Sequence, residues 1–229
     1  MKNITYTIIM IALLAVAAFL IISPQKVDAP NLDIDTESEV LIEVTPPEDV
    51  AEVSYDYSVD LERSEVSWTA GKKFIAEYID KGTLELLSGG LNITGDSEVN
   101  LDGGFVFDMD SIVVTDTGFG GGFNGLERDL KSDNFFDTNN YPTSNFTITS
   151  LSTDSTNQTI EGDLTIKGIT KPIIFALSEW NEMDQYIAGS VNVNRLDYGI
   201  DFRSEGLIGK IEDKVINDTF DIDFKIYYK

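Results

Sequence analysis

The side chains that could carry chemistry in this sequence are almost all carboxylates. The chain has 40 Asp and Glu residues but no His and no Cys. Without those two residue types, Ser-His-Asp and Cys-His catalysis, thiolate zinc sites and the common His-containing zinc sites are all excluded. Catalysis would have to rest on Asp, Glu, Lys, Tyr or a bound hard cation, for example in a glycosidase with two carboxylates. Because no acidic residue lies in a motif that singles it out, we do not expect an enzyme.

The acidic residues also raise the question of a metal site. Four of them resemble calcium ligands: Asp108, Asp110, Asp133 and Asp137. The EF-hand spacing is absent, and acidic residues are the ordinary surface of a chain whose formal net charge is -24, so we predict neither a metal nor a cofactor. The same charge repels phosphate backbones, so nucleic acid is not an expected partner. Arg195 and Asp197, two residues apart, predict an ion pair inside the domain or at its rim.

A glycine-rich segment, residues 118–125 (GFGGGFNG), is the other local motif. No Gly-Lys-Ser/Thr follows it and no parallel βαβ pattern surrounds it, so it is not a phosphate-binding loop. We interpret it as a flexible portal loop whose Phe119 and Phe123 rest on a ligand or on a membrane surface. The alternative is a mobile hairpin tip.

The elements that must position these residues are β-strands. Apolar residues alternate with polar ones over residues 220–228 (FDIDFKIYY), which is the period of a strand with one apolar face. Similar runs occupy residues 66–70, 105–110, 160–166, 173–177 and 187–193. Only Asn124–Ser132 reads as a helix, with Leu126 and Leu130 on one face. The pattern predicts an all-β, antiparallel sandwich or barrel with one short helix.

An apolar segment precedes this domain. Residues Ile4–Ile22 contain no charge and span roughly 28 Å as a helix, close to the thickness of a bilayer core. With Lys2 as a positive flank, residues 1–23 are predicted to be an uncleaved transmembrane anchor that leaves the domain in the periplasm or at the cell surface. A cleaved signal peptide is the alternative, because Ala15-Val16-Ala17 resembles a cleavage site, and the protein would then be secreted.

Residues 24–54 are predicted to be an extended linker between the anchor and a domain over residues 55–229. Ten acidic residues and no basic ones lie between Val27 and Asp56, and four prolines interrupt the segment. Prolines and like charges both extend a chain, so the linker should hold the domain away from the membrane surface.

Four segments of the domain carry a family resemblance when taken together. They are residues 64–72 with 81–86 (SEVSWTAGK, KGTLEL), 130–146 (LKSDNFFDTNNYPTSNF), 162–172 (GDLTIKGITKP) and 193–200 (VNRLDYGI). In this order and spacing they resemble the YceI-like family of polyisoprenoid-binding proteins, over about residues 55–229. The resemblance implies a lipocalin-like antiparallel β-barrel whose apolar interior takes an isoprenoid chain or an isoprenoid quinone. It implies no catalytic activity, and it implies export.

Two positions depart from the family pattern. Asp129 and Lys81 stand where the family often has His. If those histidines contact a ligand headgroup, the headgroup preference of this chain differs while the apolar lining is kept.

We predict that the inward positions of the strands line a ligand cavity. Those positions are Trp68, Phe105, Phe107, Phe146, Leu164, Phe175 and Phe224, and the candidates for a flap over one end of the barrel are Phe135 and Phe136. The expected function is therefore that of a membrane-tethered binding protein for an apolar lipid. The alternative is a structural or adhesive surface domain without a ligand, because 13 Phe, 9 Tyr and 2 Trp residues are enough to fill a small barrel.

Overall fold

The structure is a computed structural model that describes residues 54–229, apart from 96–99, 119, 121, 154–157 and 209–213. The predicted transmembrane segment, residues 1–23, lies outside the described residues, as does the predicted linker up to residue 53. In the described part of the chain, no helix is long and apolar enough to cross a membrane.

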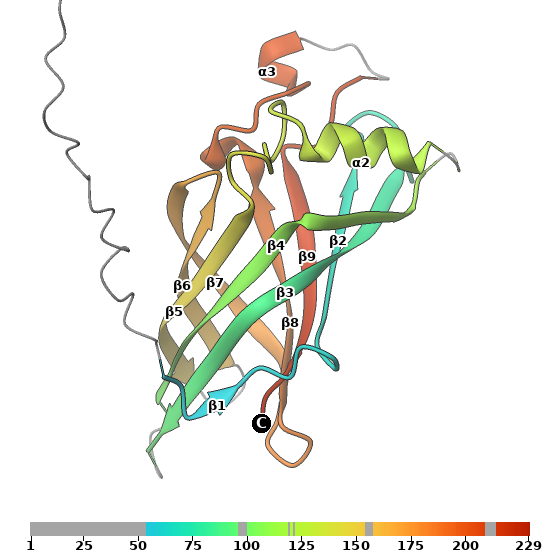
Figure 1. Cartoon of the computed structure of the whole chain (residues 1–229). Helices are drawn as coiled ribbons and strands as arrows, with labels where there is room; N and C mark the ends of the chain where they lie inside the picture. Colours follow the sequence, from blue (N-terminus) through green and yellow to red (C-terminus); the bar gives the residue numbers. More distant parts are fainter. Residues whose placement is uncertain (1–53, 96–99, 119, 121, 154–157, 209–213) are drawn as a thin grey trace, which may run out of the picture. The chain divides into compact units, whose positions relative to one another are not determined.

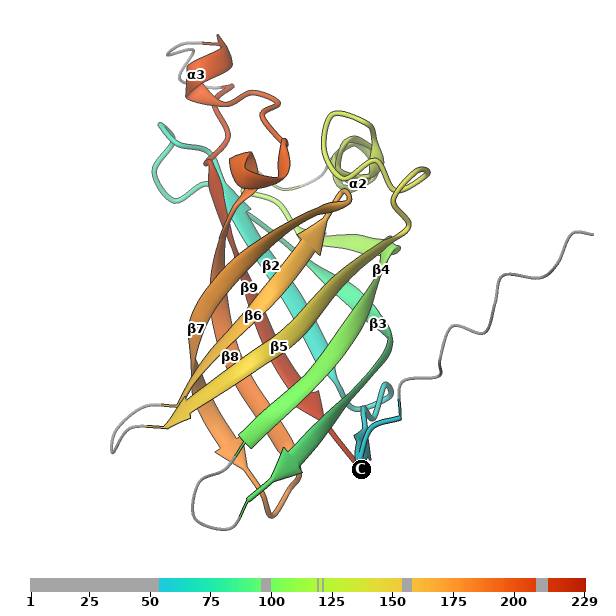
Figure 2. The ribbon, with the colours of Figure 1, turned by 90° about the vertical axis from the view of Figure 1, so that its left-hand side faces the viewer.

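Eight antiparallel strands close into a barrel, which confirms the predicted fold class (Figures 1 and 2). Around the barrel, β2 pairs with β9, β9 with β8, and so on in order to β4, which pairs with β3; the β3–β2 pairing closes the ring. A ninth, two-residue strand β1 (Tyr57–Ser58) pairs with the far part of β3. The barrel strands are β2 (Glu65–Gly71), β3 (Ile79–Thr94), β4 (Asn100–Asp116), β5 (Thr143–Thr153), β6 (Gln158–Ile166), β7 (Ile169–Asn181), β8 (Tyr186–Asn194) and β9 (Thr219–Tyr227).

Side-chain alternation explains why these strands form a barrel with an apolar interior. On β9, Ile222, Phe224 and Ile226 face inward, whereas Asp221 and Asp223 are exposed. Because the period of a strand is two, each strand presents its apolar residues to the interior and its carboxylates to water. The buried hydrophobic residues of the described part form a cluster that includes members of all eight barrel strands and residues packed against them.

The connections at one end of the barrel contain all the helices of the described residues. They comprise residues 72–78, 117–142, 167–168 and 195–218; we call this the helical end. Helix α2 (Phe123–Lys131) lies across it, and the 3₁₀-helix η1 (Arg195–Tyr198) and the short helix α3 (Glu205–Ile208) lie at the same end (Figure 1). Strand β1 and Lys229 lie at the opposite end.

The glycine-rich segment is part loop and part helix. Helix α2 begins at Phe123, so the last three residues of the predicted portal loop belong to it. Gly122 precedes the helix with φ 77°, a left-handed conformation that glycine adopts without strain. Phe119 lies outside the described residues, and Phe123 is exposed. The predicted helix over Asn124–Ser132 is confirmed with a shift of one residue.

Candidate ligand-binding cavity

A narrow cavity lies inside the barrel and reaches the helical end. Its volume is about 150 Å³, and its wall takes side chains from all eight barrel strands and from α2. The wall is almost wholly apolar. The polar side chains in it are those of Ser67, Ser144, Arg195, Asn217 and Thr219. A small volume shared by so many wall residues means that the space is slender rather than wide.

All nine residues that the sequence nominated for ligand contact lie in this wall. They are Trp68, Phe105, Phe107, Phe135, Phe136, Phe146, Leu164, Phe175 and Phe224. The inward face was therefore assigned correctly on each strand, since a slip of one residue would have turned that strand's candidates to water. Phe135 and Phe136 follow α2 and pack in edge-to-face contacts against Phe202 and Phe220, with centroids 5.4 and 6.2 Å apart. Their contact with a ligand stays a prediction.

A row of aromatic rings crosses the interior. Phe146 lies 6.5 Å from Phe105 and 5.6 Å from Phe175, centroid to centroid, and Phe175 lies 5.6 Å from Phe224. Aromatic pairs at these separations stabilise one another beyond the burial of their area. The row therefore gives the middle of the cavity a continuous apolar wall made by β4, β5, β7 and β9.

Glycines on neighbouring strands provide the space for these rings. A Cβ atom on Gly162 would lie 2.4 Å from the ring of Phe146, and one on Gly82 would lie 2.5 Å from the indole of Trp68. Real atoms do not approach so closely, so each ring needs a residue without a side chain across from it. The same relation joins Phe105 with Gly89 and Phe224 with Gly189. The sequence analysis treated these glycines as ordinary members of the alternation and missed this role.

Arg195 is the charged residue of the wall, and it is held by backbone. Its side chain donates to the carbonyl oxygens of Ile200 at 2.7 Å, Phe202 at 2.9 Å and Asn217 at 2.8 Å. Its carboxylate partner is Asp218, at 3.4 Å. The predicted pairing with Asp197 is wrong: Asp197 is exposed, and the turn of η1 directs the guanidinium inward, where the carbonyls of the 195–218 connection take up its donors. Burial lowers the pKa of Arg195 although Asp218 opposes this shift.

Two buried polar atoms of the described residues lack a hydrogen-bond partner. They are Nε1 of Trp68 and the hydroxyl of Tyr198. Tyr198 is 2% exposed, and burial, with a smaller contribution from Asp197, raises its pKa to about 12. Since an unpaired buried donor is costly, these two atoms weaken the domain slightly rather than stabilise it.

A known family of proteins shares the sequence pattern of this domain. The sequence model of the YceI-like domain matches residues 57–228. The chain belongs to the YceI-like family. Protein YceI of Shigella flexneri is 40% identical to it over 81 residues, which cover 32% of this chain and 42% of that protein. The chain thus matches less than half the length of this curated relative.

The fold of one solved structure matches this barrel, and a second solved structure is less similar. BcnA of Burkholderia cenocepacia has a TM-score of 0.56 at 17% identity and covers 73% of this chain and 98% of its own. A polyisoprenoid binding domain from Saccharophagus degradans has a TM-score of 0.49 at 18% identity, over 77% of this chain and 99% of its own. At such identities the comparison with BcnA supports the fold alone.

The two positions that depart from the YceI-like pattern do not face the cavity. Lys81 lies on the outer face of β3 and Asp129 on the solvent face of α2, and both are exposed. Neither belongs to the wall. These two side chains therefore take no part in the described interior of the barrel.

Carboxylates lie outside the cavity. None is present in the described wall, and the described residues contain no group of three potential metal ligands. The calcium candidates serve local structure: Asp110 accepts a hydrogen bond from the hydroxyl of Thr138, and Asp137 accepts from the amide of Asn140 at 3.0 Å. Burial raises the pKa of Asp80, but its carboxylate accepts from the backbone N–H of Gly118 at 3.3 Å rather than facing the interior.

Proposed function

We propose that this YceI-like barrel binds an apolar lipid in its interior, a polyisoprenoid or an isoprenoid quinone, and that it acts as a binding protein and not as an enzyme. The observation that carries the proposal is the wall itself. Every barrel strand contributes apolar side chains to one slender space, and the one charged wall residue, Arg195, is already engaged by backbone carbonyls. Such a wall offers burial and no reactive group.

The physical driving force is the removal of hydrocarbon from water. Each buried methylene contributes about 0.8 kcal/mol, so an isoprenoid chain can be held without a charged contact. The empty volume of about 150 Å³ is below the range of about 300–1,000 Å³ that is usual for ligand pockets. A long chain therefore enters only if half-buried wall side chains, such as Phe107 and Phe175, turn aside.

We further propose that the barrel is tethered to a membrane, outside the cytoplasm. The support is the uncharged segment Ile4–Ile22 and the acidic, proline-containing stretch that follows it. A tether would keep a lipid-binding barrel near the phase in which its ligand is dissolved.

The small volume also favours a second candidate, a structural domain whose interior stays filled by its own side chains. Native mass spectrometry of the purified chain, before and after incubation with decaprenol or a long-chain quinone, separates the two. A mass increase equal to one lipid supports the binding protein. If the purified chain holds no lipid and takes up neither compound, the binding protein is refuted and the structural domain with a filled interior remains.

A further inference from the structure

Charge is distributed unevenly over the domain. Among the described residues in positions 55–229, the four connections of the helical end contain eight of the 13 basic residues and nine of the 26 acidic ones, a formal net charge of -1. The other described residues include five basic and 17 acidic ones, a net charge of -12. An acidic body repels anionic surfaces, so the helical end is the part that approaches a weakly charged surface without repulsion.

Exposed apolar side chains gather at the same end. Of the twelve large hydrophobic residues that are exposed in the described part of the chain, five lie in these connections, and two more, Ile79 and Ile169, are the first residues of the strands that follow them. Leu207 of α3 is 62% exposed and Phe123 of α2 is 38% exposed. The other three in the connections are Phe74, Tyr141 and Leu196. An exposed apolar group of this kind, within a polar surrounding, is typical of an interaction surface.

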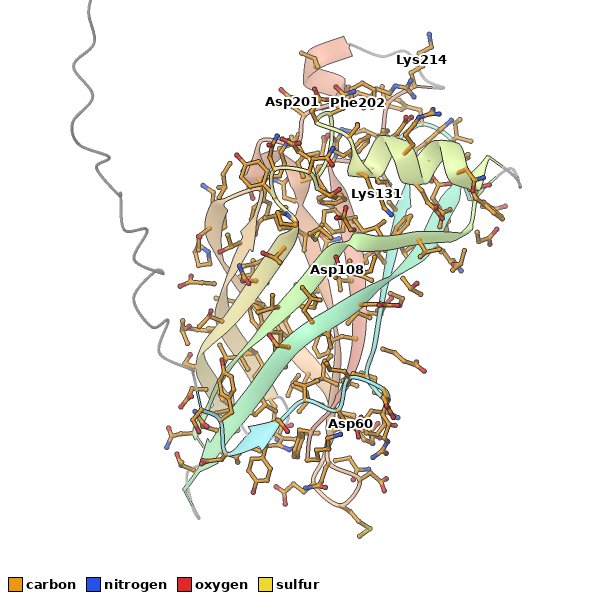
Figure 3. The ribbon with its side chains drawn as sticks, viewed as in Figure 1. Asp60, Asp108, Lys131, Asp201, Phe202 and Lys214 are labelled. Atoms are coloured by element: carbon orange, nitrogen blue, oxygen red, sulfur yellow. The ribbon has the colours of Figure 1, made fainter. Side chains whose placement is uncertain are left out.

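Several of these side chains come from connections that lie next to one another. A Cβ atom on Gly168 would lie 3.1 Å from the ring of Tyr141, and one on Gly199 would lie 3.7 Å from Cδ1 of Ile169. Charged groups stand among them in balanced pairs, as where Lys73 meets Glu205 at 2.7 Å. Figure 3 shows Lys214, Asp201 and Phe202 at this end and Asp60 at the opposite one. The surface is thus both apolar and nearly neutral.

The cavity reaches this surface. Leu130 on α2, Phe135 and Phe136 after it, and Ile200 and Ile216 in the 195–218 connection all belong to the wall. The same connections therefore carry cavity-wall residues on their inner side and exposed apolar residues on their outer side. At the opposite end, the described connections expose two large hydrophobic side chains, Leu61 between β1 and β2 and Met183 between β7 and β8.

From these observations we infer that the helical end docks on the surface of a lipid bilayer of low net charge, where the barrel exchanges its apolar ligand. The identity of the cargo rests on the proposed function; the docking surface rests on the residues above. A bilayer fits better than an acidic or basic protein because the patch pairs exposed Phe and Leu side chains with a net charge near zero, as interfacial membrane contact requires.

The absence of Cys permits a direct test on the full-length chain. Single-cysteine variants Phe123→Cys and Leu207→Cys place a bimane fluorophore on the helical end. Ile174→Cys and Met183→Cys are matched controls, because these residues are 65% and 93% exposed on the side and at the far end of the barrel. With phosphatidylcholine vesicles that contain brominated lipid, we expect quenching at positions 123 and 207 and none at 174 or 183. Equal quenching at all four positions, or none at any, overturns the inference.

A second measurement tests the apolar contact itself. In the chain labelled at position 123, Leu207→Glu should lower quenching at that position about tenfold, because a carboxylate replaces a leucine that would be buried in the interface. Met183→Glu adds the same charge at the far end and should change nothing. Replacing phosphatidylcholine by phosphatidylglycerol should weaken quenching, because anionic headgroups repel the acidic barrel. Stronger quenching on phosphatidylglycerol would contradict the role given to charge.

Failure of the docking surface can be told apart from failure of the proposed function. Lipid uptake from detergent micelles is measured on the same variants, so that no bilayer is involved. Lipid uptake without quenching of the bimane labels refutes the docking surface alone. Quenching at positions 123 and 207 without uptake of decaprenol or quinone from any source supports docking and refutes the cargo.

Discussion

A carboxylate placed in the middle of the cavity should abolish lipid uptake, and Phe175 is the position at which to place it. Phe175 lies in the wall between Phe146 and Phe224, whereas the next residue toward the N-terminus, Ile174, is 65% exposed on the outer face of β7. Phe175→Glu and Ile174→Glu therefore add the same side chain to opposite faces of one strand. We expect the first to lose decaprenol uptake and the second to keep it.

The size of the effect follows from burial. A fully buried Glu shifts its pKa upward by about 3–5 units, which corresponds to about 4–7 kcal/mol of lost stability at neutral pH, and this is the upper limit at the half-buried position 175. This is a large part of the roughly 5–15 kcal/mol that stabilises an ordinary domain. Because the folded-state pKa is raised, the penalty is full above that pKa and is relieved as the pH falls toward the unfolded value near about 4.3. Phe175→Glu should thus approach the wild type in acid.

Urea unfolding followed by tryptophan fluorescence, at pH 7.5 and at about pH 4.5, measures both effects, and uptake is assayed on the fraction that is folded. Ile174→Glu should unfold within about 0.5 kcal/mol of the wild type. If Phe175→Glu binds decaprenol as the wild type does while folded, the wall does not contact the ligand and the proposal for the cavity fails.

Three further outcomes are expected. Arg195→Met should lower the free energy of unfolding by about 3–5 kcal/mol, because it leaves buried carbonyls without donors. Arg128→Met, at an exposed position, is the control and should not lower it. Equal urea midpoints for the two variants would contradict the structural role of Arg195. Gly162→Ala should reduce stability by about 1–3 kcal/mol and reduce lipid uptake, because the new methyl group displaces a wall ring. Gly206→Ala, with no atom within 4 Å, is the control. Unchanged uptake by Gly162→Ala would show that the ring facing Gly162 does not shape the ligand site. Tyr198 should keep its proton to about pH 12 in an ultraviolet titration. Stability should fall as the pH rises from the unfolded pKa, about 10, through that value. Tyr198→Phe should reduce the fall, and the part that remains comes from the raised pKa values of Tyr78, Tyr186 and Tyr228; a normal titration would refute the burial of Tyr198.

Strand alternation predicted an antiparallel sandwich or barrel and its inward face, and the family resemblance favoured the barrel. Runs such as Phe220–Tyr228 have the period of a strand, and that period assigned Phe105, Phe175 and Phe224 to the cavity wall. The assignment succeeded because, in a closed barrel with one apolar face per strand, the apolar residues can be buried only in the interior.

The parts that sequence analysis missed depend on contacts between distant segments. Nothing local in Arg195-Leu-Asp197 indicates that the guanidinium turns toward the carbonyls of residues 200–217. Strand β3 was not recognised along its whole length, because Gly89 and Gly90 interrupt its alternation and its pairing with β4 contains register shifts. The value of Gly89 appears only when the facing ring of Phe105 is in place, and that of Gly90 only when Tyr55 is.

The two ends of the described domain are joined by hydrogen bonds to each other. The backbone N–H of Ser58 donates to the carbonyl of Lys229 at 3.0 Å, and the N–H of Lys229 donates to Ser58 at 2.9 Å. The backbone of the described domain therefore almost closes on itself, and the strand order does not depend on which residues are its first and last. A short peptide link between the two ends, with a new opening in the exposed turn at Met183, would give a circular permutant with the same barrel. Its helical end would remain free of chain termini, so that a surface or a reporter could be attached at either cut without blocking it.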